Sequence, residues 1–320
     1  MSVQVNTVLG PIDSGRLGVT LIHEHLKVAL LGFEMDPFNT YDRDAVHNMK
    51  ELRELGVSTV VDPLPMGLGR DPEFSAEVAH ASGMQIIIST GVDHEFRAMP
   101  PYFKVRTTDE IADTYVSDLT QGIGSTGIKA GIIKVATGEG AITKNEGRAV
   151  RAAARAALKT NTPIVTHTTH GTMGVEQAEM FSGEGLSPGK FMIGHCCQST
   201  DLPYLRRILD TGCFMGFDQI GMNYIQTDDN RLAMLSALLA LGYAGRLLLS
   251  QDHMCCIIGA PYERVAYMMD MIREHRHSYL LREFLPRLRE ARVPDAMIDE
   301  MMMANPRRLY ENPAKAGAGN

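Results

Sequence analysis

The chain has 320 residues and a mass of 35.2 kDa, with 44% hydrophobic and 22% charged residues. This is the composition of an ordinary globular protein, and it excludes disordered, collagen-like and coiled-coil chains. A net charge of −7 and an isoelectric point near 5.9 argue against nucleic acid or an anionic membrane as the main partner.

Eight short apolar segments recur along the chain. Most are continuous apolar runs rather than alternating ones, as expected for parallel strands that are covered on both faces. The predicted strands are residues 19–25, 57–62, 85–90, 131–137, 163–168, 191–195, 213–218 and 246–252.

Helical patterns fall between these strands. Gly56 and Gly83 follow two of them directly and are helix-ending signals, and Thr143 with Glu146 forms a capping box. The predicted helices are residues 42–55, 72–82, 107–121, 143–160, 201–210, 229–241, 278–292 and 294–303.

No repeat, low-complexity tract or linker interrupts the alternation. We therefore expect one domain over residues 1–320, with an N-terminal extension over 1–17 and a frayed tail over 313–320. Eight strand–helix units in about 300 residues are the number that a closed (β/α)₈ TIM barrel of the α/β class needs. An open, doubly wound sheet is the alternative, but no glycine-rich phosphate loop follows the first strand.

The N-terminal residues lack a basic segment followed by an apolar one, and no apolar run approaches the ~20 residues that span a bilayer. We expect neither a signal peptide nor a membrane segment. Reduced thiols in a cytoplasmic protein are the simplest interpretation of an odd number of cysteines, four of them in adjacent pairs. The cysteines are Cys196, Cys197, Cys213, Cys255 and Cys256.

Polar residues stand where five of the predicted strands end, which is the end that carries the active site in such barrels. Side chains two apart on a strand point to the same side, so both histidines of the first group would face the barrel axis. Four histidines and an aspartate at one mouth suit Zn²⁺, Co²⁺, Mn²⁺ or Fe. A lone histidine at a strand end is more often structural, whereas this set predicts a metal site. The residues are His23, His25, Lys134, His167, His195 and Asp252.

Lys134 is the unusual member of this set. Desolvation and neighbouring cations both lower the pKa of a buried lysine, so it would not remain an ammonium beside two metal ions. One interpretation is a lysine paired with a carboxylate at the rim. The other is a neutral amine that captures CO₂ and becomes a carbamate whose two oxygens bridge a metal pair.

The motifs around these residues resemble the phosphotriesterase family of the amidohydrolase superfamily, and most closely its phosphotriesterase-like lactonases. The resemblance runs from about Thr7 to Tyr310. The motifs are LGPI (9–12), GVTLIHEH (18–25), KAGIIKV (129–135), PIVTHT (163–168), IGHC (193–196), LLSQD (248–252) and NPRRLY (305–310).

The resemblance implies that His23, His25 and Asp252 hold the more buried of two metal ions, most simply zinc. His167 and His195 would hold the more exposed one. A carboxylated Lys134 and a hydroxide would bridge the two ions, so that the hydroxide attacks the substrate and Asp252 passes its proton to the leaving group.

The expected activity is hydrolysis of lactones or related carboxylic esters, with promiscuous phosphotriesterase activity. A dedicated phosphotriesterase or an amidase is the alternative, and a metal-binding barrel without catalysis is the remote one. The resemblance also implies a small-molecule substrate and a homodimer.

Two loops depart from the lactonase pattern. The lactonases have a tyrosine after the third strand, where this chain has Asp93, and an arginine after the seventh, where it has Gln219. Glutamine lacks the fixed charge and the five donors of arginine, which argues against long-chain acyl-homoserine lactones. We expect Asp93, Gln219 and His253 to contact the substrate.

The segment after Asp252 is rich in Met and Tyr, which favours core packing or an apolar leaving-group pocket. Its residues are Met254, Tyr262, Tyr267, Met268, Met269 and Met271. Asp218 ends the seventh strand, where a carboxylate could hold a ligating histidine. His94 could line the mouth, and the other histidines are expected near the surface: His47, His80, His170, His275 and His277.

Overall fold

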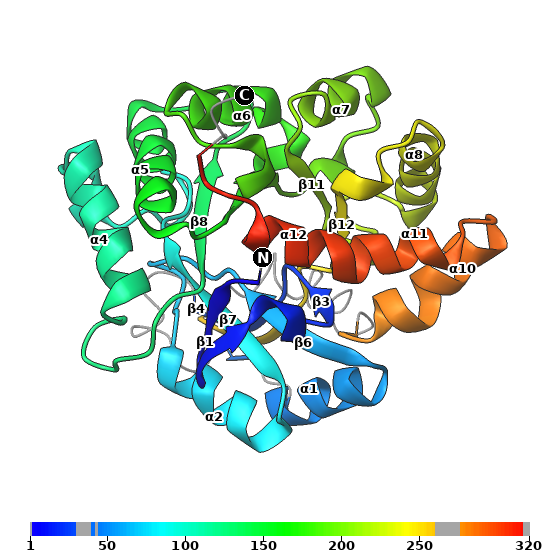
Figure 1. Cartoon of the computed structure of the whole chain (residues 1–320), viewed down its shortest axis with the longest axis horizontal. Helices are drawn as coiled ribbons and strands as arrows, with labels where there is room; N and C mark the ends of the chain where they lie inside the picture. The colour runs from blue at the N-terminus through cyan, green and yellow to red at the C-terminus, as the bar shows by residue number, and fades with distance from the viewer. Residues whose placement is uncertain (1, 30–39, 42–43, 260–275, 316–320) are drawn as a thin grey trace.

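The computed structural model describes residues 2–29, 40–41, 44–259 and 276–315, and a ring of parallel strands surrounded by helices lies at its centre (Figure 1). The strands pair in the order β3–β6–β7–β8–β9–β10–β11–β12, and every pairing is parallel. The predicted number of strands and the predicted barrel are confirmed. The bounds are β3 Val19–Leu21, β6 Val57–Asp62, β7 Gln85–Gly91, β8 Ile132–Thr137, β9 Ile164–Thr168, β10 Phe191–Ile193, β11 Phe214–Phe217 and β12 Leu247–Leu249.

The two end strands of this order, β3 and β12, meet at a seam. There the amide of His23 donates to Ser250 Oγ at 3.0 Å, and the amide of Asp252 donates to the carbonyl of His23 at 2.9 Å. Beyond the seam, β4 (His25–Ala29) runs parallel to β13 (Met254–Ile258), and β5 (Thr40–Tyr41) pairs with β13 on its other side. The predicted strands 19–25 and 246–252 are therefore too long, because both segments stop pairing with the neighbouring barrel strands before they reach the seam residues.

Helices cover the outside of the ring (Figure 1). Their bounds are α1 Ala45–Glu54, α2 Pro72–Ser82, α3 Pro101–Lys104, α4 Thr108–Thr120, α5 Lys144–Thr160, α6 Gly174–Gly183, α7 Leu202–Leu209, α8 Asp228–Ala240, α10 Leu285–Glu290, α11 Asp295–Asp299 and α12 Asn305–Glu311. The predicted capping box opens α5, where Glu146 N donates to Thr143 Oγ1 at 3.2 Å and Thr143 N donates to Glu146 Oε2 at 2.9 Å.

Three helix predictions need correction. The first predicted helix begins only at Ala45, and residues 42 and 43 lie outside the described part of the chain. In addition, helices α3, α6 and α12 were not predicted. The last two predicted helices contain wider π-helical turns, at Leu280–Phe284 and Glu300–Ala304.

The barrel interior is filled by an apolar layer with one fully buried side chain from most strands. Its members are Ile22, Val61, Ile87, Ile132, Val165, Met192, Phe214 and Leu248. Lys134 and His167 lie two residues after the layer members of β8 and β9. Because side chains on a strand alternate, both point to the barrel axis above this layer.

The opposite end of the barrel is closed by the two ends of the chain (Figure 1). Within the predicted N-terminal extension, β1 (Gln4–Thr7) and β2 (Gly10–Asp13) form an antiparallel hairpin. Val5 from this hairpin and Leu309 and Tyr310 from α12 pack against the apolar layer. Part of the expected tail is fixed, since Ala314 O accepts from Ser187 N at 2.7 Å, and residues 316–320 lie outside the described residues.

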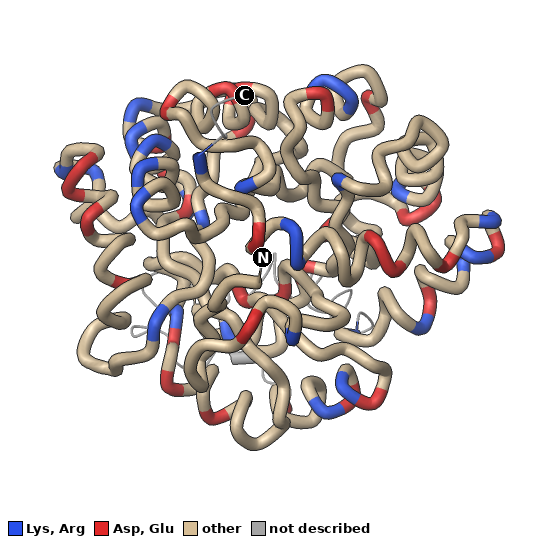
Figure 2. The backbone as a smooth tube through the Cα atoms, viewed as in Figure 1, with Lys and Arg blue, Asp and Glu red and all other residues tan. Residues whose placement is uncertain are grey.

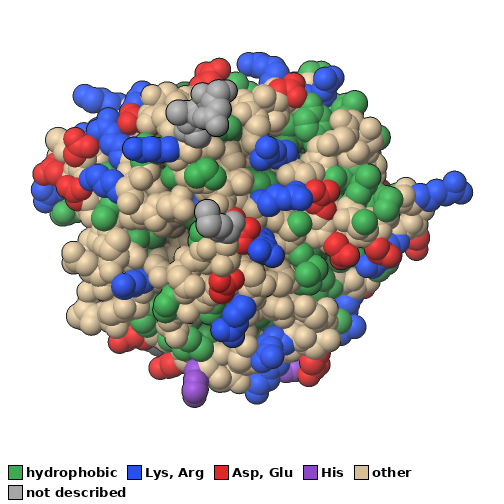
Figure 3. Space-filling view, in the orientation of Figure 1, with side chains coloured by type: hydrophobic (Ala, Val, Ile, Leu, Met, Phe, Trp, Pro, Cys, Tyr) green, Lys and Arg blue, Asp and Glu red, His purple; other side chains and the backbone are tan. Residues whose placement is uncertain are grey.

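Charged side chains of both signs mix along the outer helices (Figure 2) and over the face that carries the N-terminus (Figure 3). Three basic residues of α5, Arg151, Arg155 and Lys159, pair with acidic side chains of neighbouring elements. Arg155 pairs with Asp109 of α4 at 2.8 Å and with Glu184, just after α6, at 2.9 Å. In the described part of the chain, no helix combines the length and apolarity needed to cross a membrane.

Candidate metal centre

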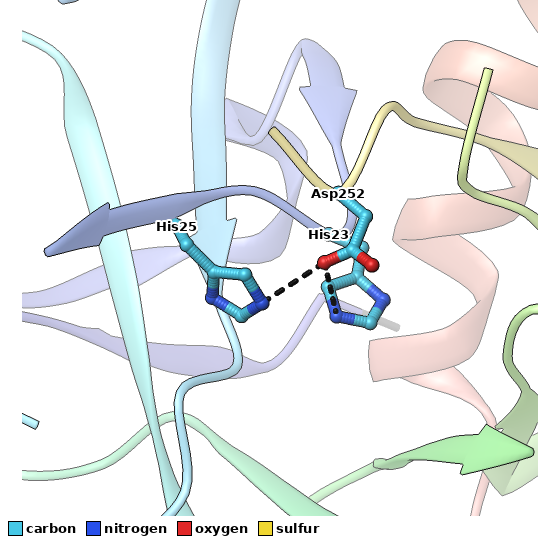
Figure 4. Close-up of side chains that lie close together, drawn as sticks. All are labelled: His23, His25 and Asp252. Carbon is cyan, nitrogen blue, oxygen red and sulfur yellow. Dashed lines mark ion pairs between the residues drawn. The ribbon is translucent and has the colours of Figure 1, made fainter. Parts of the chain in front are cut away.

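Two of the predicted histidines converge on one carboxylate at the carboxyl-terminal end of the barrel (Figure 4). The Nε2 atoms of His25 and His23 lie 3.0 and 3.5 Å from Asp252 Oδ1. His23 lies in the turn between β3 and β4, His25 is the first residue of β4, and Asp252 lies in the segment after β12. Two imidazole nitrogens and one carboxylate oxygen at this spacing are a suitable ligand set for a divalent cation.

The other predicted ligands lie beside this group. His195 stacks on His23 with ring centroids 4.8 Å apart, and it meets His167 edge to face at 4.5 Å. The Nε2 atom of His195 is 3.8 Å from Asp252 Oδ2. Lys134 Nζ lies 3.1 Å from His23 Nε2. The structure thus brings all six predicted ligands into one cluster, in which Asp252 is the most exposed member.

The convergence of His23 and His25 does not arise from alternation along one strand, which corrects the predicted reason. β3 ends at Leu21, and the amides of Glu24 and His25 bond to Val61 O and His253 O, at 2.9 and 2.8 Å. The two histidines therefore flank a turn that other strands hold in place.

Two other predicted ligands have unusual backbone conformations. His195 and Asp252 have φ values of 60° and 53°, in the left-handed region that costs about 1–3 kcal/mol for a residue other than glycine. This conformation turns each side chain away from the direction that continuing the strand would give it. At Gly194, before His195, a side chain would meet the carbonyl oxygen of Thr166 at 2.2 Å, so only glycine fits. The surrounding fold stores this strain at the metal centre.

Two buried carboxylates orient the histidine rings from behind. Asp218 Oδ2 accepts from Nδ1 of His23 at 2.8 Å, and its Oδ1 faces the amide and Nδ1 of His195 at 2.7 and 3.3 Å. Asp62 Oδ1 lies 3.0 Å from Nδ1 of His25. A proton fixed on Nδ1 leaves the Nε2 lone pair available to a metal ion.

Asp218 also lies near enough to His23 and His195 to be a ligand itself. Its oxygens face the Nδ1 atoms, however, and the Nε2 atoms of both rings face Asp252. We therefore assign Asp218 to positioning the rings, the role predicted for it. Asp62 was not predicted, although it ends an apolar strand at the same edge, and that position was a usable signal.

Burial and charge shift the pKa values of the cluster. Burial lowers the pKa of Lys134 to about 8, and burial together with Lys134 lowers the pKa of His23 to about 3. Burial alone would raise the pKa of Asp252, but His23 and His195 hold it well below its usual range. Asp252 and Asp62 overcome burial and raise the pKa of His25 to about 9. The centre thus holds an ionised aspartate beside a lysine that loses its proton easily.

The three predicted substrate contacts have partners within the protein. The Asp93 carboxylate is fully buried and forms an ion pair with Arg97. Gln219 Nε2 donates to Asp252 Oδ2 at 2.9 Å, and its Oε1 accepts from Gln198 Nε2 at 2.6 Å. His253 is buried, and its ring lies edge to face against His277 at 4.1 Å.

Arg97 is a residue that the sequence reasoning missed. It lies in the loop after β7, and the adjacent His94 stacks on His167 with ring centroids 5.8 Å apart, as expected for a residue at the mouth. No motif marks Arg97, because a loop rather than a strand end brings it to the centre.

The remaining predictions have mixed outcomes. His47, His80 and His170 are exposed as expected, but His277 is buried and only 1% exposed, which corrects its assignment to the surface. His275, Tyr262, Tyr267, Met268, Met269 and Met271 lie outside the described residues. All five cysteines are buried and none forms a disulfide, and the adjacent pair 255–256 belongs to β13.

Comparison with known proteins gives one consistent result. A family model described as the phosphotriesterase family matches residues 3–310. An aryldialkylphosphatase of Saccharolobus solfataricus is 34% identical over 93% of this chain and 96% of its own. A phospho-furanose lactonase of Mycoplasmopsis synoviae is 30% identical over 95% of this chain and 90% of its own. The solved organophosphorus hydrolase from Deinococcus radiodurans superposes with a TM-score of 0.90, at 35% identity over 96% of each chain.

Proposed function

The chain belongs to the phosphotriesterase family and is a metal-dependent hydrolase that acts on ester bonds, and we propose that its substrates are lactones or closely related carboxylic esters. The observation that supports this most is the convergence of His23, His25 and His195 on the Asp252 carboxylate. The similarity to a phospho-furanose lactonase favours cyclic esters as the main substrates. The similarity to an aryldialkylphosphatase favours phosphotriesters as a second, slower class.

We propose that the centre holds two divalent ions, with zinc the best match to its imidazole and carboxylate donors. His23, His25 and Asp252 would hold one ion, and His167 and His195 the other. When bound, such ions lower the pKa of a coordinated water to near 7 and polarise the carbonyl of the ester. The donor set fits them, since Asp218 and Asp62 hold the Nδ1 side of three rings.

Lys134 is proposed to act as a carbamate that joins the two halves of the centre. Only a neutral amine reacts with CO₂, and a pKa near 8 leaves about one lysine in ten neutral at pH 7. Its Nζ lies beside His23 Nε2, so the added carboxylate would lie within the cluster of ligands. The new negative charge would also offset the positive charge that accumulates there.

Asp252 is proposed to accept a proton from the attacking water and to deliver it to the departing alcohol. It can accept one because its low pKa keeps it ionised at neutral pH. Gln219 donates to Asp252 Oδ2 and is itself held by Gln198, which fixes the plane of the carboxylate. The reaction adds water across the ester, so the products are a carboxylate and an alcohol.

We propose in addition that the enzyme is a cytoplasmic homodimer. Its five buried cysteines form no disulfide, which favours a reducing compartment, and the family resemblance favours the dimer. Size-exclusion chromatography with light scattering on the purified chain measures the second of these directly, and a monomer at micromolar concentration would contradict it.

The test of the function is a substrate panel with the metal-loaded protein. It should contain γ- and δ-lactones, acyl-homoserine lactones, aryl esters, an acylated amine and a paraoxon-type triester, with kcat/KM measured for each. We expect lactones to give the highest values. An Asp252→Asn variant, purified in parallel, controls for contaminating esterases. A preference for the triester by about 100-fold, or 2.7 kcal/mol, would make phosphotriesters the main substrates instead.

A further inference from the structure

A positively charged side chain lies at the rim of the metal centre in an orientation fixed by a buried partner. The guanidinium of Arg97 is held by Asp93, whose Oδ1 accepts from Nη2 at 2.8 Å while Oδ2 pairs with Nε. The carboxylate of this pair is fully buried, yet the arginine side chain is 43% exposed. The positive charge of the pair is therefore exposed, and its negative charge is buried.

The same loop connects Arg97 to the proposed ligands. His94 lies between the two members of the pair, and its ring stacks on His167 with an interplanar angle of 27°. The amide of Arg97 donates to the carbonyl of His94 at 3.2 Å. The loop that carries Arg97 therefore contacts the proposed ligand His167 through the His94 ring.

Arg97 also has unused hydrogen-bonding capacity. A guanidinium carries five N–H donors, and two of them bond to Asp93. Among the described residues, no further side-chain hydrogen bond of Arg97 is present. The remaining donors form a planar edge, which is the geometry that binds a carboxylate or a phosphate.

The Arg97–Asp93 pair differs from an ordinary surface ion pair formed by a second arginine, Arg106. Arg106 pairs with Glu110 at 3.2 Å, and the two side chains are 38% and 50% exposed. That pair is solvated on both sides, as surface pairs usually are. In the Arg97 pair only the cation reaches solvent, so its orientation is fixed before any ligand arrives.

We propose that Arg97 binds an anionic group of the substrate, and that the preferred substrates are therefore lactones or esters that carry a carboxylate or a phosphate near the bond that is cleaved. This inference rests on the proposed function. It adds a specificity residue on the loop after β7, and it assigns Asp93 to positioning that residue instead of contacting the substrate. Arg97 would act on binding more than on the chemical step.

The test compares three γ-lactones that differ only in one substituent: a neutral one, one with a carboxylate and one with a phosphate. The enzyme should have a higher kcat/KM for the anionic pair, and the two anionic arms show which group it prefers. In Arg97→Gln, kcat/KM for anionic lactones should fall by about 10- to 100-fold, mainly through KM, because a charge-assisted hydrogen bond is lost. The value for the neutral lactone should stay within error. Arg106→Gln, which loses the same charge at a solvated pair, should match the parent.

A second variant guards against local disorder, because Arg97→Gln leaves the Asp93 carboxylate buried without its partner. The double change Asp93→Asn with Arg97→Gln removes both charges and should show the same selective loss. An equal loss for neutral and anionic lactones in both variants would assign Arg97 a structural role only and overturn the inference. If the parent enzyme cleaves the neutral lactone but does not favour the anionic ones, the inference fails and the proposed function stands. If the parent cleaves none of the three, both fail.

Discussion

Asp218 is the residue whose replacement tests the metal centre most directly. Its two oxygens hold His23 Nδ1 at 2.8 Å and His195 at both the amide and Nδ1, at 2.7 and 3.3 Å. In the proposed centre these histidines bind different ions. The change Asp218→Asn keeps the size of the side chain but removes its charge and one of its acceptor oxygens, so it disturbs both rings at once.

The expected loss of metal affinity in Asp218→Asn follows from the fact that this one carboxylate orients two histidine rings. Removing a carboxylate that orients one ligating histidine typically costs 10- to 100-fold in metal affinity. An asparagine at position 218 can accept with its oxygen alone, so at least one of the two rings loses its proper partner. We expect the affinity for both ions to fall by about 10- to 100-fold each, with the larger loss at the ring that faces the amide nitrogen.

Competition against a chelator of known affinity, combined with metal analysis of the protein, measures this loss. Asp62→Asn is the matched control, because among the described residues His25 is the one histidine whose ring Asp62 contacts, so the change should weaken a single ion. The melting temperatures of the metal-free variants separate a loss of affinity from a loss of folding. The reasoning would be refuted if Asp218→Asn bound both ions as tightly as the parent, or if Asp62→Asn weakened both equally.

Other outcomes can be expected from the same structure. Lys134→Ala should lower kcat by about 100-fold or more, and short carboxylic acids should restore part of it, as a substitute for the carbamate; absence of rescue would contradict the bridging role. Removal of the ions by a chelator should abolish hydrolysis and lower the melting temperature, because only the folded chain binds them. Adding Zn²⁺ or Co²⁺ should restore both the hydrolysis and the melting temperature. Hydrolysis by the metal-free protein would show that the reaction does not need the metal centre. Asp71→Ala should cost about 1–2 kcal/mol of unfolding free energy at pH 7, since Asp71 caps α2 through Phe74 N at 3.0 Å and pairs with Lys27. Burial would raise the pKa of Asp71, but Lys27 and the α2 amides hold it below 3.8. The charge of Asp71 therefore contributes its full stabilisation above pH 3.8, and this stabilisation is lost as the pH falls through the lower pKa of the folded state. In urea unfolding, the substitution should reduce the free energy of unfolding less at pH 3 than at pH 7.

Local signals in the sequence predicted those helices whose ends carry caps. Helix α2 has the predicted bounds, because Asp71 caps its start and Gly83 ends it in the left-handed conformation. Helix α6 was missed because it lacks such signals. Its first residue is a glycine, and Met173 before it makes no capping hydrogen bond.

At the metal centre, the residues on the strands or within three positions of a strand end were predictable, and those farther along a loop were not. Lys134 and His167 follow from strand alternation above a buried layer. Arg97 and its buried partner depend on the course of a loop, and His277 becomes buried because its ring packs under His253, 24 positions earlier in the chain (277 − 253). Neither contact follows from the periodicity of a strand or helix, because Asp93 and Arg97 meet across an irregular loop and His253 and His277 belong to separate segments.

An ion bound at the proposed centre would join the two sides of the barrel seam. His23 and Asp252 stand on opposite sides of it and are 229 positions apart (252 − 23). An ion held by both would be a reversible cross-link that closes a loop of most of the chain, and closing a loop of that length removes about 5 kcal/mol of chain entropy from the unfolded state in the polymer model. When the ions are removed, the barrel should therefore open first between β3 and β12. Amide hydrogen exchange should then accelerate more along these two strands than elsewhere.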